Sequence, residues 1–197
     1  MARVAGIVLG AGASRRLGRP KQTLPLGNTT LLGWAVRAAE ESSLASVVLV
    51  VGGAADEALS GLVLQRAEIV RNDAYGEGCA SSLLAGLSAA GACDAVMLLL
   101  GDMPGLGSSA IDSVLAEWEK HRPWGLVTEY DDGPGHPFVF GADAFPALRA
   151  LHGDKAVWKL LDREGDRIHR ARLAGPRPQD VDTWGDYEAV CAALVPL

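Results

Sequence analysis

Apolar residues along the chain fall in short runs, separated by segments with helical spacing. Several runs are apolar throughout rather than alternating, which is typical of strands buried on both faces of a sheet. Helical spacing of apolar residues predicts helices near residues 32–39, 111–118 and 187–194. The alternation of the two patterns predicts a three-layer α/β/α, Rossmann-like fold with a mostly parallel sheet. The predicted strands are Val4–Leu9, Ser46–Val51, Ala67–Arg71, Ala95–Leu100, Gly125–Glu129 and Pro137–Phe140.

Two local patterns refine this picture. The strand-like segments between residues 124 and 140 are joined by the acidic, glycine-rich stretch Asp131–Gly135, so we expect a hairpin-like insertion and a mixed sheet. Thr183 and Asp186 are spaced as a capping box at the start of the last helix. No repeat or long linker divides the 197 residues, which predicts a single domain over residues 1–197.

Composition excludes several functional classes. The net charge of −6 argues against general nucleic-acid binding, which needs a basic face. Three widely spaced cysteines make a disulfide scaffold or a structural zinc site improbable and suit a reducing compartment. No apolar run approaches ~18 residues, and the N-terminal run breaks into glycines, so neither a membrane span nor a signal peptide is predicted. We therefore expect a cytoplasmic protein with no membrane partner.

The loop after the first predicted strand is the strongest chemical signal. Gly10, Ala11 and Gly12 allow close approach of the backbone to a ligand, and their N–H groups can surround phosphate oxygens. Four cations follow within seven positions of an otherwise acidic chain, which favours a polyphosphate ligand. These cations are Arg15, Arg16, Arg19 and Lys21.

Two common phosphate motifs fit this loop poorly. A P-loop requires a GK[S/T] ending, but Gly18 is followed by Arg19–Gln22. A dinucleotide fingerprint requires a third glycine where Arg15 stands, and Pro20 and Pro25 interrupt the helix that should follow.

Leu9–Lys21 instead resembles the LAAGxSxRMGxxK signature of nucleotidyltransferases with a GT-A-like fold, and most closely the molybdenum-cofactor cytidylyltransferases. Gly10 and Leu17 stand where that family usually has Ala and Met. The resemblance implies that the first loop contacts the base and phosphates, and that Arg16 and Lys21 hold the triphosphate and act in catalysis. The implied nucleotide-binding positions of this loop are Leu9, Gly10, Ala11, Gly12, Ser14, Arg15, Arg16 and Lys21.

A second segment, Asn72–Leu87, has the pattern of a loop that leads into a helix. Hydroxyls and N–H groups at such a helix start can bind a base edge or an anion. The segment resembles the base-recognition motif GxxxSLxxGL of the same family. The implied contacts are Asn72, Gly78, Ser81 and Ser82, although an ordinary serine cap on a core helix also fits.

The predicted strand Ala95–Leu100 ends in Gly101-Asp102-Met103-Pro104. A buried strand that delivers one carboxylate at its tip is a usual way to hold Mg²⁺ beside phosphates, although a plain turn aspartate also fits. The motif resembles the metal-binding motif of the same family, which implies that Asp102 binds Mg²⁺ and that Gly101 lies beside the nucleotide. Residues 180–187 resemble the family's DIDTPEDY ending, which implies Asp182 as second ligand with Asp180 nearby. Mn²⁺ could replace Mg²⁺.

The segments that face the acceptor in this family are less well matched. Gly133–Phe138 resembles its GHP segment, which implies that His136 and Pro137 contact the acceptor, although a lone histidine in a turn can also be structural. Asp154 lies in a GDxGxR-like segment that departs from the pattern at Ala156 and Trp158. The acceptor is therefore less defined than the donor.

Together these features predict a Mg²⁺-dependent nucleotidyltransferase that transfers CMP from CTP to a phosphorylated acceptor such as molybdopterin, with release of pyrophosphate. The resemblance further implies a role in molybdenum-cofactor biosynthesis and a molybdoenzyme partner. Three alternatives stay open: a guanylyltransferase using GTP, a dinucleotide-dependent oxidoreductase using the glycine loop, and a non-catalytic nucleotide or pterin carrier. The sequence does not indicate an oligomeric state.

Overall fold

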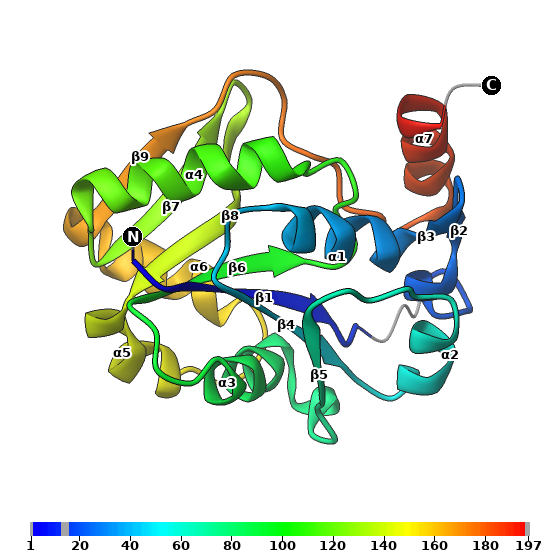
Figure 1. Cartoon of the computed structure of the whole chain (residues 1–197), viewed down its shortest axis with the longest axis horizontal. Helices are drawn as coiled ribbons and strands as arrows, with labels where there is room; N and C mark the ends of the chain where they lie inside the picture. Colours follow the sequence, from blue (N-terminus) through cyan, green and yellow to red (C-terminus); the bar gives the residue numbers. More distant parts are fainter. Residues whose placement is uncertain (1, 13–15, 196–197) are drawn as a thin grey trace.

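The computed structural model describes residues 2–12 and 16–195 and contains one twisted seven-stranded sheet (Figure 1). The strand order is β5-β4-β1-β6-β8-β7-β9, and only β8 runs antiparallel to its neighbours. The strands are β1 (Val4–Gly10), β4 (Ser46–Val51), β5 (Ala67–Arg71), β6 (Ala95–Leu100), β7 (Gly125–Tyr130), β8 (Gly133–Gly141) and β9 (Ile168–Arg172). The predicted α/β class and the mostly parallel, mixed sheet are confirmed.

The central strands explain the continuous apolar runs in the sequence. Strand β1 lies between β4 and β6, with Ile7 opposite Val48 on one side and Leu98 on the other. Because helices cover both faces of the sheet, most residues of these strands are buried, and the three named side chains are at most 2% exposed. The carboxyl ends of β1 and β6 therefore lie side by side in a rigid core.

Helices on the two faces close two separate apolar layers (Figure 1). Side chains from α1, α2 and α4 pack on one face, and side chains from α3, α5 and α6 pack on the other. The helices are α1 (Leu31–Glu41), α2 (Ala55–Ser60), α3 (Cys79–Ala89), α4 (Ser108–His121), α5 (Phe145–Arg149), α6 (Ala156–Arg163) and α7 (Trp184–Leu194).

The predicted hairpin insertion is present. Strands β7 and β8 pair antiparallel on either side of a turn at Asp131 and Asp132, and the register shifts between Val127 and Thr128. Strand β8 begins at Gly133, four residues before the predicted start at Pro137. This early part of β8 pairs with β7 alone, so it is not buried between two strands and lacks an apolar pattern.

The last helix packs away from the sheet, against the small hairpin of β2 (Pro25–Leu26) and β3 (Thr29–Thr30). Val181 and Val190 join Leu24, Leu26 and other apolar residues in a third cluster. The helix begins with the predicted capping box, in which Thr183 and Asp186 exchange hydrogen bonds between side chain and backbone. Leu17, which follows the glycine-rich turn, packs in this third cluster. Four short 3-10 helices complete the described elements: Lys21–Thr23, Tyr75–Glu77, Ala142–Ala144 and Gly165–Arg167.

Candidate active site

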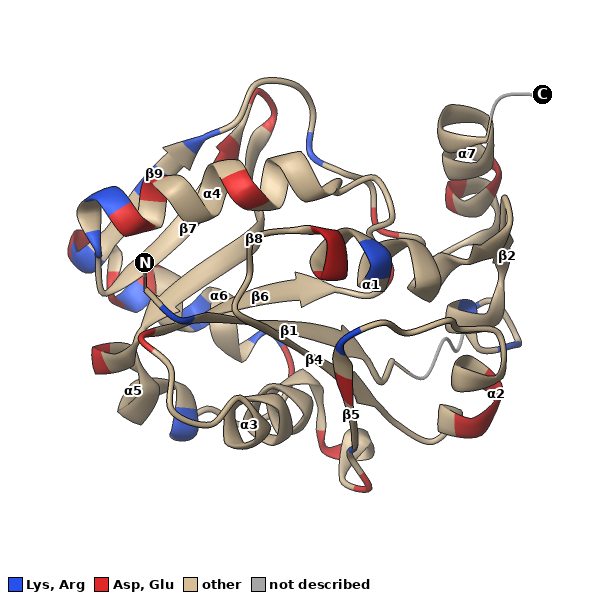
Figure 2. Cartoon of the chain, in the orientation of Figure 1, with Lys and Arg blue, Asp and Glu red and all other residues tan. Residues whose placement is uncertain are grey.

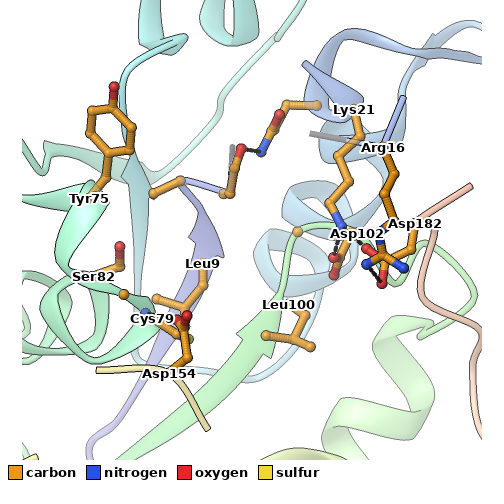
Figure 3. A pocket seen from close by; sticks show the side chains of 17 residues that line it. Leu9, Arg16, Lys21, Tyr75, Cys79, Ser82, Leu100, Asp102, Asp154 and Asp182 are labelled. Atoms are coloured by element: carbon orange, nitrogen blue, oxygen red, sulfur yellow. Dashed lines mark hydrogen bonds and ion pairs between the residues drawn. The ribbon is translucent and has the colours of Figure 1, made fainter. Parts of the chain in front are cut away.

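A cavity of about 520 Å³ opens at the carboxyl ends of β1 and β6 (Figure 3). This edge is where open α/β sheets bind their ligands, because loops from neighbouring parallel strands converge there. Segments far apart in the sequence meet around it. The described lining residues are Leu9, Gly10, Ala11, Gly12, Arg16, Lys21, Gln22, Tyr75, Gly76, Gly78, Cys79, Ser82, Leu100, Gly101, Asp102, Asp154 and Asp182.

The glycine-rich turn forms one wall of the cavity through its backbone. Gln22 is buried and donates from Nε2 to the carbonyl of Gly12 at 2.9 Å. At the base of the turn, the N–H of Gly101 donates to the carbonyl of Leu9 at 2.9 Å. A Cβ on Gly101 would lie 2.5 Å from Leu32 and 3.0 Å from that carbonyl, so glycine is required for this close approach. These contacts fix the turn against the neighbouring strand.

Three charged segments meet at the opposite wall (Figure 3). The ammonium of Lys21 lies 2.5 Å from Asp102 Oδ2 and 2.9 Å from Asp182 Oδ1. The guanidinium of Arg16 lies 2.5 Å from Asp182 Oδ2. Figure 2 shows that basic residues lie on the described part of the segment between β1 and β2. Two cations and two carboxylates thus form one network, although 80 or more residues separate its three segments.

The backbone holds both carboxylates in place. Asp102 follows β6, and its carbonyl accepts a hydrogen bond from the N–H of Val181 at 3.0 Å. This bond brings Asp182 to the tip of β6. The capping box orients the same segment, because Asp186 also accepts from the N–H of Asp182 at 3.1 Å. The C-terminal segment therefore adds Asp182 to a charged network whose other members are Arg16, Lys21 and Asp102.

Burial and ion pairing act in opposite directions on the two carboxyl groups. Burial raises the pKa of Asp102, and the ammonium of Lys21 only partly offsets it. Hydrogen bonds and charge from Lys21 and Arg16 hold the pKa of the more exposed Asp182 below its usual range. Burial alone would lower the pKa of Lys21, but the two aspartates outweigh it and raise that pKa. Additional positive charge near Asp102 would therefore be stabilising.

The donor set fits a hard divalent cation. Asp102 Oδ1 is shielded from solvent and has no hydrogen-bond partner among the residues that the structure describes. A buried carboxylate oxygen without a partner is costly unless something else coordinates it. Mg²⁺ and Mn²⁺ prefer oxygen ligands and need only one or two protein carboxylates. Asp180 is exposed and contributes no side chain to the described lining.

The start of α3 forms the third wall. Gly78 precedes the helix with a φ of 105°, and a Cβ there would lie 2.7 Å from the backbone of Gly153. The Asp154 carboxylate accepts from the N–H of Cys79, the first residue of the helix, at 2.9 Å. Asp154 thus lines the cavity and also satisfies one of the helix's free N–H groups. Ser82 lines the cavity from the first turn of the same helix.

Some predicted binding residues lie behind the described lining. Asn72 is buried and donates from its amide to the hydroxyls of Ser81 and Ser82, at 2.9 and 3.0 Å. It supports Ser82 rather than facing the cavity directly. Ser14 and Arg15 lie outside the described residues. The roles of all these side chains toward a nucleotide remain predictions.

His136 and Pro137 are also absent from the described lining. The His136 ring is buried, lies 3.3 Å from the carbonyl of Leu98 through Nδ1, and packs on Phe138 with centroids 3.9 Å apart. Burial lowers the pKa of His136 to about 4, despite the opposing effect of the Leu98 carbonyl. Trp158 packs edge-on against both rings, which accounts for this aromatic residue where the family pattern commonly has Arg. Contact of His136 with an acceptor stays a prediction.

Several lining residues have no strong signal in the sequence. Tyr75 and Gly76 form a short 3-10 helix before α3, while Gln22 and Leu100 flank residues already predicted. Cys79 lines the cavity, but burial and the nearby Asp154 raise the pKa of its thiol, which does not favour a nucleophilic thiolate. Tyr75 and Cys79 both lie in the second motif, a few residues before the predicted serines. Their place in that motif could have indicated that they line the cavity.

The fold, the glycine-rich turn and the paired carboxylates define a Rossmann-like nucleotidyltransferase. A family described as "MobA-like NTP transferase domain" matches residues 6–168, and the chain belongs to this family. Asp182 lies beyond the matched residues. Among the described residues, no helix combines the length and the apolar character needed to cross a bilayer.

Several known proteins are similar to this chain over most of its length. The crystal structure of a homologue of Mycobacterium tuberculosis Rv0371c, from Mycobacterium sp. strain JC1, is 43% identical, covers 98% of this chain and 97% of its own, and has a TM-score of 0.90. A manganese complex of Rv0371c from Mycobacterium tuberculosis is 31% identical, covers 97% and 99%, and has a TM-score of 0.82. Nicotine blue oxidoreductase from Paenarthrobacter nicotinovorans is 33% identical over 80% of this chain and 81% of its own length.

Proposed function

We propose that this chain transfers a nucleotidyl group from a nucleoside triphosphate to a phosphorylated small molecule and releases pyrophosphate. The observation that carries the proposal is the convergence of Arg16, Lys21, Asp102 and Asp182 beside the glycine-rich turn. Two cations suit the phosphates of the donor, and two carboxylates suit a divalent cation. A cavity of about 520 Å³ is within the usual size range of small-molecule sites.

The transfer needs positioning and charge neutralisation more than acid–base chemistry. An anionic phosphate oxygen of the acceptor forms the new bond to the α-phosphorus, and the bond from that phosphorus to the bridging oxygen of the β-phosphate breaks. Pyrophosphate leaves with the electron pair of the broken bond. Because the attacking oxygen is already anionic near neutral pH, no general base is required. Lys21 and Arg16 offset negative charge as it develops on the leaving phosphates.

Asp102, with Asp182, would hold a divalent cation, which we assign to Mg²⁺ with Mn²⁺ as a substitute. Such a cation supplies charge neutralisation at the phosphates of the donor. Support comes from the unpartnered Asp102 Oδ1 and from the relative of 31% identity that was crystallised with manganese. Lys21 bridges both carboxylates, so it also keeps them close together.

We favour CTP as the donor and molybdopterin or a related phosphorylated pterin as the acceptor. The donor preference rests on the likeness of Leu9–Lys21 and Asn72–Leu87 to the cytidylyltransferase group. The acceptor preference is carried by that same likeness, and Asp154 lies at the cavity wall where an acceptor could be recognised. GTP is the competing donor.

The test is pyrophosphate release from each of the four NTPs with Mg²⁺ and a panel of phosphorylated acceptors that includes molybdopterin. We expect release with CTP and a pterin phosphate. Release with GTP would identify a guanylyltransferase. Tight binding of CTP without release for any acceptor would instead indicate a carrier. Asp102→Asn is the matched negative control, because it keeps the size of the side chain and removes its charge.

A second candidate function has one specific observation in its favour. The relative with 33% identity is named an oxidoreductase, and the glycine-rich turn of this chain could hold the diphosphate of a dinucleotide. The turn lacks the third glycine of the dinucleotide fingerprint. Thermal-shift measurements with NADH, NADPH and CTP separate the two functions, because only the oxidoreductase should be stabilised more strongly by a dinucleotide than by CTP with Mg²⁺.

A further inference from the structure

Three potential metal ligands come together outside the cavity, on the sheet face covered by α4. Glu117 and His121 lie one turn apart on α4, and His169 is the second residue of β9. Both imidazole Nε2 atoms approach the same carboxylate oxygen, Glu117 Oε1, at 3.1 Å from His121 and 3.0 Å from His169. The two rings stack with centroids 4.5 Å apart. We refer to these three residues as the His–Glu cluster.

The spacing of this cluster is close to that of a tetrahedral metal site. Metal–ligand distances of 2.0–2.2 Å place neighbouring ligand atoms about 3.3 Å apart. Both Glu–His distances are within a few tenths of an ångström of that value, and all three ligand atoms lie within 4.8 Å of one another. Small movements of partly exposed side chains would therefore bring the three atoms around one ion.

The local electrostatics also favour a cation. His121 is the last residue of α4, and the C-terminus of a helix attracts positive charge. The carboxylate of Glu117 supplies the negative charge of the cluster and contacts both imidazoles. Lys120 approaches the other oxygen, Oε2, at 4.0 Å, which leaves Oε1 to the two imidazoles.

We propose that the His–Glu cluster binds a divalent transition metal of the zinc class, separately from the metal at Asp102. Two imidazoles and one carboxylate suit Zn²⁺, whereas Mg²⁺ prefers oxygen ligands. Three protein ligands leave a fourth position for water. On binding, each imidazole would exchange its contact with Glu117 Oε1 for the ion. Its neutral form would then carry the proton on Nδ1 and present an unprotonated Nε2 to the metal.

The position of the cluster means that a bound metal would stabilise the edge of the sheet. Strand β9 is an edge strand that pairs only with β7, and His169 lies opposite Leu126 near the start of both strands. The cavity of the proposed nucleotide site lies at the carboxyl ends of β1 and β6. A metal at the cluster would link this edge strand to α4. A ligand that binds only the folded chain raises its stability by mass action.

The test is calorimetric titration of the tag-free full-length protein with ZnCl₂, together with its thermal unfolding in Zn²⁺ and in Mg²⁺. Both are run on the wild type, on His169→Gln and on Glu117→Gln. His152→Gln is the matched control, because His152 is an exposed histidine outside the cluster. We expect Zn²⁺ to raise the melting temperature of the wild type and of the control. Loss of a ligand should weaken Zn²⁺ binding by at least about tenfold.

Asp102→Asn separates this site from the proposed nucleotide site. We expect the Zn²⁺-induced shift to persist in Asp102→Asn and to be lost in His169→Gln. Co²⁺ provides a second readout, since coordination by imidazole gives visible absorption bands that should disappear in both cluster variants. The proposal is overturned if Zn²⁺ binding is equal in the wild type and the cluster variants, or if Asp102→Asn alone removes it.

Discussion

The carboxyl edge of β1 and β6 and the hairpin of β7 and β8 both carry motif residues, but the fold uses them differently. At the first region, Lys21, Asp102 and Asp182 point into one cavity and form a charged network. At the second, His136 turns into an apolar layer against Phe138 and Trp158. Parallel strands that end together gather their loops at one edge, whereas an antiparallel strand begins at that edge and continues into the core. A motif residue on β8 is therefore more easily buried in the apolar core.

The difference extends to electrostatics. Lys21 and Asp102 are partly buried, yet each has an ionic partner, so charge persists in the cavity. His136 is buried and pairs with no carboxylate among the described residues, and burial lowers its pKa to about 4, so it is neutral at physiological pH. The carboxyl edge of β1 and β6 gathers charged side chains that suit a charged ligand, whereas the β7–β8 hairpin keeps its buried histidine uncharged. The predictions below test this contrast.

The largest effect is expected at the charged edge. Asp102→Asn should reduce turnover by about 1000-fold or more, because a bound metal contributes several kcal/mol of charge stabilisation. Excess EDTA should have a similar effect on the wild type, with recovery on addition of Mg²⁺. Pyrophosphate release measures both. Circular dichroism and thermal unfolding verify that the variant is folded, and near-normal turnover in a folded Asp102→Asn would contradict the metal assignment.

The next effect is expected in the apolar layer, as a dependence of stability on pH. A histidine whose pKa falls from 6.5 to about 4 on folding stabilises the protein above pH 6.5, and this contribution is lost as the pH falls through 4. The difference corresponds to about 3 kcal/mol. Urea unfolding at pH 7 and pH 4 should show that the wild type loses about this much more free energy of unfolding than His136→Phe. Equal losses in both proteins would mean that folding does not lower the pKa of His136.

A smaller effect should distinguish the two C-terminal aspartates. Asp182→Asn should reduce turnover by about 10- to 100-fold, since Asp182 shares Lys21 with Asp102. Asp180→Asn is the matched control and should change turnover by less than about threefold, because the residue is exposed and lies outside the described lining. Activation-constant measurements for Mg²⁺ in both variants complete the test. The reverse ranking would assign the second ligand to Asp180.

The smallest effect is expected at the capping box that supports Asp182. Thr183→Ala removes the side chain that accepts from the N–H of Asp186, and should lower the free energy of unfolding by about 1 kcal/mol. Turnover in the folded variant should change little. Chemical denaturation measures the free energy of unfolding, and the melting temperature serves as a second measure of stability. An unchanged stability would show that α7 frays independently of the rest of the chain.

The sequence predicts the interior of the sheet well, because burial on both faces leaves a continuous apolar run. The predicted bounds of the interior strands β4 and β6 match the structure, and β1 is one residue longer. Edge strand β5 also matches its predicted bounds, although its side chains are partly or fully exposed. Edge strand β9 was not predicted, since only Ile168 and Ala171 are apolar in it. Helix α6 was also missed: it is eight residues long and begins after Lys155, which has a φ of 56° and provides no side-chain cap.

For the candidate site, the sequence identifies residue types near the ligand but not their mutual contacts. The cations of the first loop and Asp102 were predicted from local patterns, and the structure brings Arg16, Lys21 and Asp102 to one cavity. That Lys21 bridges Asp102 and Asp182 depends on the Val181–Asp102 backbone bond, which no local pattern encodes. The position of Gln22 behind Gly12 likewise depends on how the loop folds back on itself.

The backbone bond between Val181 and Asp102 has a consequence for how this architecture can be divided. A polypeptide cut after β9 would keep all seven strands of the main sheet and the whole glycine-rich turn, but it would lack Asp182. Such a shortened chain should still capture a nucleotide while being unable to assemble the full carboxylate pair. The same cut would take Val181 and Val190 out of the third apolar cluster and uncover Leu24. The last twenty-five residues thus combine two tasks, since they seal an apolar surface and supply one carboxylate of the proposed pair.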